Sequence, residues 1–348
     1  MNRNAEVRLS VVIPARNAAA TIASTVNSIV RQNVPGVEVL VVDDGSSDDL
    51  RVPLEPFLQS SPVRLIRQAA LGVSVARNRG VEDSAGSFIM FVDSDDRLPD
   101  NSLADFLACA VRSEAEITIS DFYIARSGSR EFIRSMNTER VEFGPDDRSV
   151  LQWLTIARVG FGREKNVGLL GAPWAKIYRR SFLEDRLEGK LTFMPDVARG
   201  QDVLFNTEAF GIATRVTYWR SPCYEYVVSS SSSSHRSTSD FETKVEALAG
   251  FVFDLLRSRR WSDLEPAAHK MVITLLEESL LRRGKALTTG QARELLTRQP
   301  FSSALRGARL RDFSLAGKAK LVVFRAGGAP TWSAMRLISW VRQIRNSA

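Results

Sequence analysis

The sequence has few of the residues on which several classes of site depend. Among its 348 residues are two cysteines and two histidines. Two cysteines, Cys109 and Cys223, cannot build a disulfide framework, so we expect a reducing compartment. Two histidines, His235 and His269, are too few for a His-rich zinc centre or for a catalytic relay of several histidines. The sequence therefore excludes both kinds of site.

Long apolar runs and glycine-rich phosphate loops are absent as well. No stretch approaches the roughly 18 apolar residues that a membrane-spanning helix needs. The first residues also lack the apolar core of a secretory signal, so we expect a cytoplasmic protein. Neither G-x-x-x-x-G-K-S/T nor G-x-G-x-x-G occurs, which argues against P-loop and Rossmann dinucleotide sites.

Charge is distributed unevenly along the chain. The whole chain carries +7, from 47 Lys+Arg and 40 Asp+Glu. Residues 241–348 hold 19 of the basic and 9 of the acidic residues, a net charge of +10, which leaves −3 for residues 1–240. We therefore predict two parts that do different work, residues 1–240 and a basic region at 241–348. No recognised nucleic-acid-binding module accompanies the basic charge, so nucleic acid is not an expected partner.

The first part of the chain alternates two kinds of apolar pattern. Short β-branched runs typical of buried strands occur at residues 9–14, 37–42, 63–66, 88–92 and 117–122. Apolar residues at helical spacing lie between them, at residues 22–30, 72–81 and 103–110. This alternation predicts an α/β fold with a mostly parallel sheet that helices cover on both faces.

Later segments have other patterns. Residues 125–171 lack this rhythm and are rich in charge, Gly and Ser, so we interpret them as a variable insertion. Residues 229–234 are six consecutive serines, which predict a loop because such a run does not hold regular structure unaided. From residue 241 onward, the spacing of apolar residues predicts a helical C-terminal region.

Polar residues follow three of the predicted strands. The first strand ends in Pro14-Ala15-Arg16-Asn17, the second in Asp43–Asp48 and the fourth in Asp93–Asp96. In an open parallel sheet, ligands bind outside the carboxyl ends of the strands. We therefore expect the three segments to share one site.

The segment Asp93–Asp96 places three carboxylates within four residues. Carboxylates this close repel one another unless a cation neutralises them, and ligands that are all oxygen favour Mg²⁺ or Mn²⁺. Such an ion would balance a diphosphate and stabilise it as a leaving group. The alternative is an acidic turn at the start of the helix that begins near Asn101.

Six segments occur in an order that resembles glycosyltransferase family 2. They are Val11–Pro14, Val42–Asp48, Ala76–Gly80, Gly86–Asp96, Pro173–Arg180 and Gly200–Asn206. The resemblance extends over roughly residues 9–228. It implies a GT-A fold, a nucleoside-diphosphate sugar as donor, and transfer of the sugar to a hydroxyl group with inversion. A UDP-sugar and a carbohydrate or lipid-linked acceptor, in cell-surface polysaccharide or glycoconjugate synthesis, are the expected partners.

The resemblance also implies roles for single residues. Asp202 would be the general base that takes the proton of the acceptor hydroxyl. Asp96 and Asp95 would meet the metal, and we add His235, which would reach it when the serine-rich loop closes. The donor and the transferred sugar would contact Asp44, which accepts a hydrogen bond from a uracil-like base, and Pro14, Arg16, Asn17, Gly45, Ser46, Arg77, Asn78, Asp93, Ser94, Asp95, Trp174, Lys176 and Gln201.

Plainer interpretations compete with four of these roles. Asp202 would instead cap the helix that it precedes. Trp174 would be a core residue and Arg77 an exposed helix residue. His235 would be a solvated loop residue.

Two positions depart from the family pattern. Arg16 stands where an aromatic residue usually stacks on the nucleobase; a guanidinium plane also stacks, but the base preference would change. Gln201 stands where Glu usually precedes the catalytic Asp, which removes a charge near the acceptor. A catalytically inactive GT-A scaffold is therefore an alternative. A sugar-1-phosphate nucleotidylyltransferase is a weaker one, because the loop at residues 14–18 has no glycine.

The end of the chain combines an apolar face with basic charge. The apolar face consists of Trp332, Met335, Leu337, Ile338, Trp340, Val341 and Ile344, with Arg336, Arg342 and Arg345 interspersed. This pattern is typical of an amphipathic helix that lies on an anionic membrane, here the inner face of the cell membrane. One alternative is a terminal helix that docks on the protein by the same face, and another is a basic surface that binds a polyanionic acceptor.

Overall fold

The computed structural model describes residues 8–60, 62–157, 170–184, 189–228, 240–335 and 338, with the backbone alone at residues 60 and 285. The chain forms two compact units. Unit 1 consists of Met1–Leu151, Arg163–Val197 and Gln201–His235, and unit 2 of Gln152–Gly162, Ala198–Gly200 and Arg236–Ala348. The domain boundary predicted at residue 240 stays a prediction.

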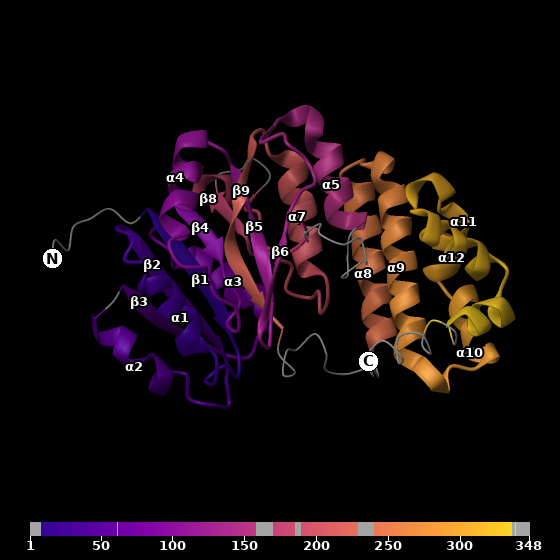
Figure 1. The fold of residues 1–348 in the computed structure, drawn as a ribbon, viewed down its shortest axis with the longest axis horizontal. Coiled ribbons are helices and arrows are strands. Elements are labelled where there is room, and N and C mark those ends of the chain that lie inside the picture. The colour runs from indigo at the N-terminus through magenta and orange to yellow at the C-terminus, as the bar shows by residue number, and fades with distance from the viewer. Residues whose placement is uncertain are drawn as a thin grey trace. The chain divides into compact units, whose positions relative to one another are not determined.

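Unit 1 is built on a mixed sheet whose first four strands are parallel. These strands are β1 (Leu9–Ala15), β2 (Val37–Asp44), β3 (Val63–Gln68) and β4 (Phe88–Phe91). Their order in the sheet is β3-β2-β1-β4, with every neighbouring pair parallel (Figure 1). The α/β prediction is confirmed, and the carboxyl ends of these strands meet at one edge.

The second half of the sheet contains antiparallel strands that the sequence patterns did not predict. Strand β8 (Lys176–Arg179) lies antiparallel between β4 and β5 (Ile117–Arg126), and β9 (Val216–Val227) runs parallel to β5. The segment interpreted as an insertion begins inside β5 and then forms β6 (Ser129–Ile133), β7 (Glu142–Phe143) and the helix α5 (Arg148–Ala157). Strands β6 and β7 pair with β5 and β9, so pairing partners hold them where their own apolar pattern is weak.

Helices accompany the sheet in unit 1, and the amphipathic ones bury an apolar stripe. The helices that lie wholly within unit 1 are α1 (Ile22–Val30), α2 (Arg51–Ser60), α3 (Val73–Glu82), α4 (Leu103–Ser113), α6 (Arg180–Glu184) and α7 (Gln201–Ile212). In α1, Ile22, Val26 and Ile29 are buried at helical spacing. In α3, a Cβ at Gly80 would lie 2.2 Å from Val12 Cγ1, so glycine is required for this close approach to β1.

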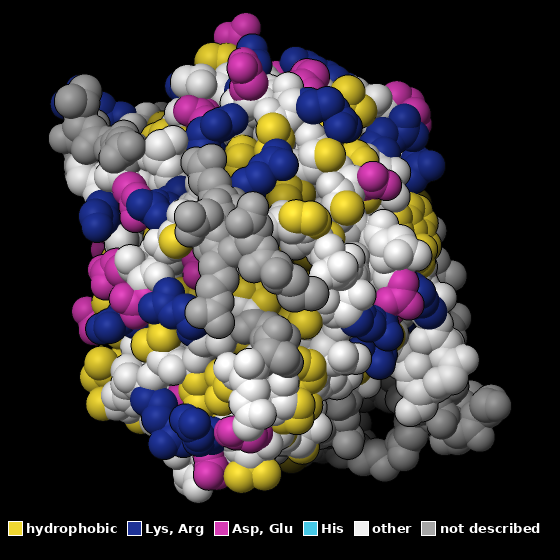
Figure 2. Space-filling model, turned by 90° about the vertical axis from the view of Figure 1, so that its left-hand side faces the viewer, with side chains coloured by type: hydrophobic (Ala, Val, Ile, Leu, Met, Phe, Trp, Pro, Cys, Tyr) yellow, Lys and Arg dark blue, Asp and Glu magenta, His cyan; other side chains and the backbone are white. Residues whose placement is uncertain are grey.

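The surface near the first strands carries both signs of charge. On the face shown in Figure 2, the side toward which α2 and β3 lie in Figure 1, Lys and Arg side chains are interspersed with Asp and Glu. The net charge of −3 in residues 1–240 is therefore not a single acidic field on this face.

Unit 2 is helical, as predicted for the C-terminal region. Its main helices are α8 (Phe241–Ser258), α9 (Glu265–Arg283), α10 (Thr289–Thr297), α11 (Phe301–Gly307) and α12 (Leu315–Arg325). Ion pairs join them: Arg283 to Glu242 at 2.8 Å, and Lys320 to Glu277 at 2.8 Å. In the part of the chain that the structure describes, every helix is too short or too polar to cross a membrane.

The predicted apolar face at the chain end is partly covered. Residues 328–335 are helical, Met335 is buried, and Trp332 donates a hydrogen bond from Nε1 to the carbonyl oxygen of Leu287 at 2.8 Å. These two members of the face dock on unit 2, as the alternative held. Leu337, Trp340, Val341 and Ile344 lie outside the described residues, so the membrane contact stays a prediction.

Candidate active site

The loops after β1 and β2 are tied together at the carboxyl edge of the sheet. The backbone N–H of Asn17 donates to Ser46 Oγ at 3.0 Å, and the N–H of Ser47 donates to Asn17 Oδ1 at 2.8 Å. Gly45 has φ +68°, and a Cβ there would lie 2.6 Å from the backbone nitrogen of Ala70. Three residues predicted to contact the donor, Asn17, Gly45 and Ser46, thus shape the edge itself.

The first strand places its two other predicted residues differently. Pro14 is buried within β1, and Arg16 is exposed just after it. The guanidinium of Arg16 is therefore available to stack on a ligand, whereas the buried side chain of Pro14 is not exposed for contact with a donor.

Asp44, at the end of β2, is a buried acceptor surrounded by donors. Its Oδ1 accepts from Gln68 Nε2 at 2.9 Å and from the N–H of Leu71 at 2.9 Å, and the N–H of Gly72 reaches both oxygens at 3.0 and 3.1 Å. Because each carboxylate oxygen has two lone pairs, Oδ2 retains capacity for one more donor. This arrangement suits the N–H of a nucleobase.

The acidic segment after β4 contains carboxylates in two different environments. Asp96 is fully buried and accepts hydrogen bonds from the Tyr224 hydroxyl at 2.5 Å and from the N–H of Val227 at 2.7 Å. Burial, together with the charge of Asp93, raises the pKa of Asp96 well above its usual range, while the Tyr224 hydrogen bond opposes the rise. Asp93, Ser94 and Asp95 are half-buried, so this part of the segment faces the site.

Trp174 lies behind this segment in the core. It is 5% exposed, and its ring stacks on Tyr224 with centroids 4.8 Å apart and on Tyr226 at 5.9 Å. The core interpretation of Trp174 therefore describes its position. Its contact with Tyr224 supports the hydroxyl that holds Asp96.

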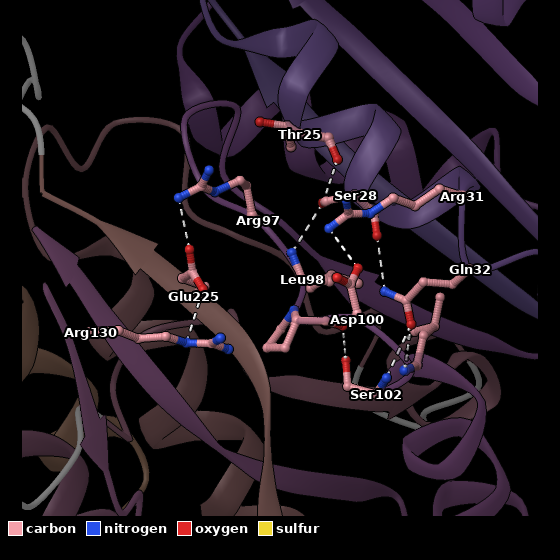
Figure 3. Close-up of polar contacts among 12 residues, drawn as sticks. Thr25, Ser28, Arg31, Gln32, Arg97, Leu98, Asp100, Ser102, Arg130 and Glu225 are labelled. Atoms are coloured by element: carbon pink, nitrogen blue, oxygen red, sulfur yellow. Dashed lines mark hydrogen bonds and ion pairs between the residues drawn. The ribbon is translucent and has the colours of Figure 1, made fainter. Parts of the chain in front are cut away.

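Helix α1 holds the acidic loop in place through its polar side chains (Figure 3). Thr25 Oγ1 donates to the carbonyl oxygen of Ser94 at 3.0 Å. Ser28 Oγ accepts from the N–H of Leu98 at 3.0 Å, a contact that Figure 3 draws. Gln32 Oε1 accepts from two backbone N–H groups at residues 102 and 103, at 3.1 and 3.0 Å. The sequence analysis missed these residues. A signal was present in their spacing of i, i+3 and i+7: Thr25 and Ser28 lie one turn apart on α1, and Gln32 follows just after the helix ends.

Arg77 joins the acidic loop to the predicted base. From α3, its Nη2 pairs with Asp93 Oδ1 at 3.0 Å and its Nη1 with Asp202 Oδ1 at 2.6 Å. Its side chain is 3% exposed, so the interpretation of Arg77 as an exposed helix residue is wrong. Its Nε finds no acceptor among the described residues. One guanidinium therefore bridges two carboxylates from distant parts of the sequence.

Asp202 lies in the first turn of α7, as its second residue, and not at the position that caps the helix. Its side chain is 29% exposed. Burial raises the pKa of Asp202, and the Arg77 guanidinium opposes the rise. A carboxylate with a raised pKa is a stronger base than an ordinary aspartate, provided that it is ionised at the working pH.

Lys176 is a second cation beside the predicted base. It is 1% exposed, and its Nζ donates to the carbonyl oxygen of Ala172 at 2.6 Å. Burial lowers the pKa of Lys176 to about 7, and the charge of Asp202 opposes the fall. The lysine is thus buried beneath the site, where it acts on Asp202 electrostatically.

Of the remaining predicted residues, Asn78 supports the surroundings of the site. Asn78 exchanges two hydrogen bonds of 2.8 Å with the backbone of Phe193 and so fixes the segment before α7. The buried Oε1 of Gln201 finds no donor among the described residues. His235, predicted as a metal ligand, lies outside the described residues.

The acidic segment fits a divalent metal only in part. Within the described ranges, no three His, Cys, Asp or Glu side chains are grouped so as to hold a metal ion. Mg²⁺ is usually bound through one or two carboxylates together with substrate phosphates, so such a cage is not required. Half-buried Asp93 and Asp95 meet that description. Asp96 as a direct ligand stays a prediction: each of its oxygens accepts one hydrogen bond and keeps a second lone pair, but its side chain is fully buried.

The sheet topology and the acidic edge define a GT-A-type α/β protein whose site lies at the strand ends. The sequence model of glycosyl transferase family 2 matches residues 10–187. The chain belongs to this family.

Two relatives of known sequence are also named as glycosyltransferases. The chain is 28% identical over 237 residues to the uncharacterized glycosyltransferase YibD of Escherichia coli K12, covering 66% of this chain and 64% of YibD. It is 31% identical over 121 residues to the Escherichia coli UDP-Glc:alpha-D-GlcNAc-diphosphoundecaprenol beta-1,3-glucosyltransferase WfgD, covering 35% and 48%. The chain thus spans less than two thirds of the length of either relative.

A solved structure shows the same fold. The protein resembles S. aureus TarS 1–349, solved in complex with UDP-GlcNAc, with a TM-score of 0.60 and 21% identity. The likeness covers 97% of this chain and 92% of the TarS chain. At this identity the comparison shows the fold alone.

Proposed function

We propose that the protein is an inverting glycosyltransferase that moves a sugar from a nucleoside-diphosphate sugar, in particular a UDP-sugar, to a hydroxyl group. The observation that carries the proposal is the placement of Arg77. It pairs with Asp93 at 3.0 Å, in the segment that would face the diphosphate, and with Asp202 at 2.6 Å. The carboxylate beside the proposed leaving group and the proposed base thus contact the same guanidinium.

The donor base would bind at the end of β2. A uracil ring presents one N–H between two carbonyl oxygens, and Asp44 Oδ2 has the capacity to accept that N–H. Backbone N–H groups at residues 71 and 72 already surround the carboxylate and keep it oriented. The exposed guanidinium of Arg16 would stack on the ring in place of the usual aromatic residue.

Asp93 and Asp95 would hold Mg²⁺ or Mn²⁺. The ion would neutralise charge on the departing diphosphate. Asp96, fixed by Tyr224 and Val227, would position the loop that presents these two residues. Thr25 and Ser28 of α1 would hold the same loop from the other end.

Asp202 would take the proton of the acceptor hydroxyl as the oxygen attacks the anomeric carbon. The bond from the anomeric carbon to the diphosphate oxygen breaks as the new bond forms, and the electron pair leaves with the diphosphate. A single displacement of this kind inverts the anomeric centre, and its transition state resembles an oxocarbenium ion. Arg77 and Lys176 would keep Asp202 ionised before the attack.

The name of one relative supports an acceptor class. The name of WfgD specifies a diphosphate-linked lipid acceptor, and the family match includes the acidic edge of this chain. We therefore propose a carbohydrate or lipid-linked acceptor in the synthesis of a cell-surface polysaccharide or glycoconjugate.

The test is a panel of nucleotide sugars with two readouts, the thermal stabilisation of the protein and the release of UDP, each with and without Mn²⁺. We expect stabilisation and metal-dependent release with a UDP-sugar. Asp202→Asn should retain stabilisation and lose release. Asp105→Asn, an exposed acid in the first turn of α4, is the matched control and should retain both. Stabilisation without turnover by the unaltered protein, on any donor and acceptor, would favour the inactive scaffold.

A further inference from the structure

Arg97 and Arg130 share a single carboxylate, that of Glu225 (Figure 3). Arg97 Nη2 lies 2.8 Å from Glu225 Oε1, and Arg130 Nε lies 3.1 Å from Glu225 Oε2. The two arginine side chains are 44% and 45% exposed, whereas Glu225 is 13% exposed. The group thus carries an excess positive charge, and its cations face solvent more than its anion does.

The two arginines have donors beyond those that Glu225 occupies. Among the described residues, neither Arg97 nor Arg130 forms an ion pair with another carboxylate. Arg97 donates one N–H to Glu225, Arg130 forms an ion pair with it, and a guanidinium has five N–H groups. Both arginines therefore have donors left for a ligand.

The group is built on the same frame as the acidic site. Arg97 directly follows Asp96, and its backbone exchanges hydrogen bonds with the backbone of Glu225, at 3.1 and 2.8 Å. Tyr224 and Val227, which hold the Asp96 carboxylate, lie on either side of Glu225 along β9. A ligand bound by these arginines would be held at a defined place beside the loop that presents Asp93 and Asp95.

Aromatic side chains fix one of the cations. The guanidinium carbon of Arg130 lies 3.6 Å from the ring centroid of Tyr123, and the ring of Phe132 packs edge-on against Tyr123 with centroids 6.0 Å apart. Stacking keeps the guanidinium plane in one orientation, which lowers the entropy lost when it binds a planar or tetrahedral anion. Phe132 is 43% exposed and offers an apolar face next to the charge.

We propose that Arg97 and Arg130 form a binding site for a phosphate group of the acceptor, a phosphodiester or a diphosphate. The proposal rests on the acceptor class of the proposed function. Guanidinium groups bind phosphate oxygens through paired, charge-assisted hydrogen bonds. Glu225 balances one of the two arginine charges, and a phosphate would neutralise the other. The exposed Phe132 ring would contact the neighbouring sugar or lipid portion of the acceptor.

The experiment measures the affinity of inorganic pyrophosphate by calorimetry, at fixed ionic strength, without divalent metal and with the donor site saturated by UDP. The variants are Arg97→Gln/Arg130→Gln, Glu225→Gln and, as the control, Arg126→Gln. Arg126 lies on the same hairpin, is 50% exposed and pairs with Glu131, so it changes surface charge without touching Glu225. We expect the double variant to bind about tenfold more weakly and Arg126→Gln to bind as the unaltered protein does.

Glu225→Gln should change the pyrophosphate affinity in the opposite direction. Removing its charge frees both cations, so pyrophosphate should bind several-fold more tightly, whereas a purely structural ion pair predicts only a lower melting temperature. Equal affinity in the unaltered protein and the double variant would overturn the proposal. An equal loss in Arg126→Gln would also overturn it, because surface charge alone would then explain binding.

Two further measurements keep the test decisive. Melting temperature reports whether each variant folds; if the double variant does not, Arg130→Gln alone should weaken pyrophosphate binding about threefold, and unchanged binding would overturn the proposal. UDP affinity is measured separately for each variant and should not change. If the unaltered protein does not bind UDP, the proposed function is contradicted. The pyrophosphate affinities would still report on the arginine pair in that case.

Discussion

Two groups of arginines and carboxylates extend from the loop after β4, and they have opposite ratios of cations to carboxylates. In one, a single cation, Arg77, serves two carboxylates, Asp93 and Asp202, and its side chain is 3% exposed. In the other, a single carboxylate, Glu225, serves two arginines that are 44% and 45% exposed. The first group is part of the site's interior, and the second is part of its surface.

The difference follows from solvation. Removing one member of a buried ion pair strands its partner in a medium that solvates it poorly, at a typical loss of about 3–5 kcal/mol. An exposed pair contributes about 0–1 kcal/mol, because water already solvates both ions. The buried group should therefore determine stability and catalysis, and the exposed group should be free to exchange its partner for a ligand. The four predictions below test this contrast.

The largest effect is expected for Asp202→Asn. The amide still accepts a hydrogen bond from Arg77, so folding and UDP binding should be retained. It takes no proton, however, and a positioned general base contributes about 10²–10⁴-fold to the rate. The measurement is the transfer rate with a competent donor and acceptor, alongside melting temperature and UDP affinity. Transfer at the rate of the unaltered protein would mean that Asp202 is not the general base.

Arg77→Met should lower the free energy of unfolding by about 3 kcal/mol, because it strands Asp93 and Asp202 together. Urea denaturation measures this change. The variant also loses the cation that holds down the pKa of Asp202, so the acid limb of its rate profile should move to higher pH. A loss no greater than that of Arg97→Gln would remove the contrast between the two groups.

Lys176→Met should change how stability depends on pH. Burial lowers the folded-state pKa of Lys176 to about 7, below the value near 10.5 of the unfolded chain. Between those values the unfolded chain binds more protons, so stability should rise with pH, by up to about 1.4 kcal/mol per pH unit.

The useful window for this lysine is pH 7 to 8, below the pKa near 8.5 at which cysteine titrates in the unfolded chain. Urea denaturation across it should show a steeper rise for the unaltered protein than for Lys176→Met. Parallel curves would mean that Lys176 stays charged in the folded protein. Lys270→Met, a half-buried lysine of α9 in unit 2, is the control and should leave the slope unchanged.

The smallest effect is expected for Arg97→Gln. The Arg97 side chain is 44% exposed and Glu225 keeps Arg130 as a partner when Arg97 is replaced, so the free energy of unfolding should fall by less than about 1 kcal/mol. Urea denaturation measures the change, and 0.5 M salt should diminish it further by screening the pair. A loss as large as that expected for Arg77→Met would mean that Glu225 is a structural ion, and its arginines would not be available to a ligand.

Much of the fold was predictable because its signals are local. The β-branched runs of β1, β2 and β4 and the helical spacing in α1, α3 and α4 lie within short windows of sequence. Strand β8 was not predictable as a neighbour of β4. It is four residues long, and its place between two distant strands depends on pairing that no local pattern encodes.

The site likewise has features that the sequence predicts and features that depend on tertiary contacts. The sequence by itself determined the family, the segments at the strand ends and the candidate residues, because parallel strands bring their carboxyl ends to one edge. Only the tertiary structure decided which of three neighbouring aspartates is buried: Asp96 meets Tyr224 and Val227, residues far along the chain. It alone placed Arg77 between two carboxylates, one of them 125 positions away. Contacts of this kind depend on packing and solvent access, which are properties of the folded chain and of no segment within it.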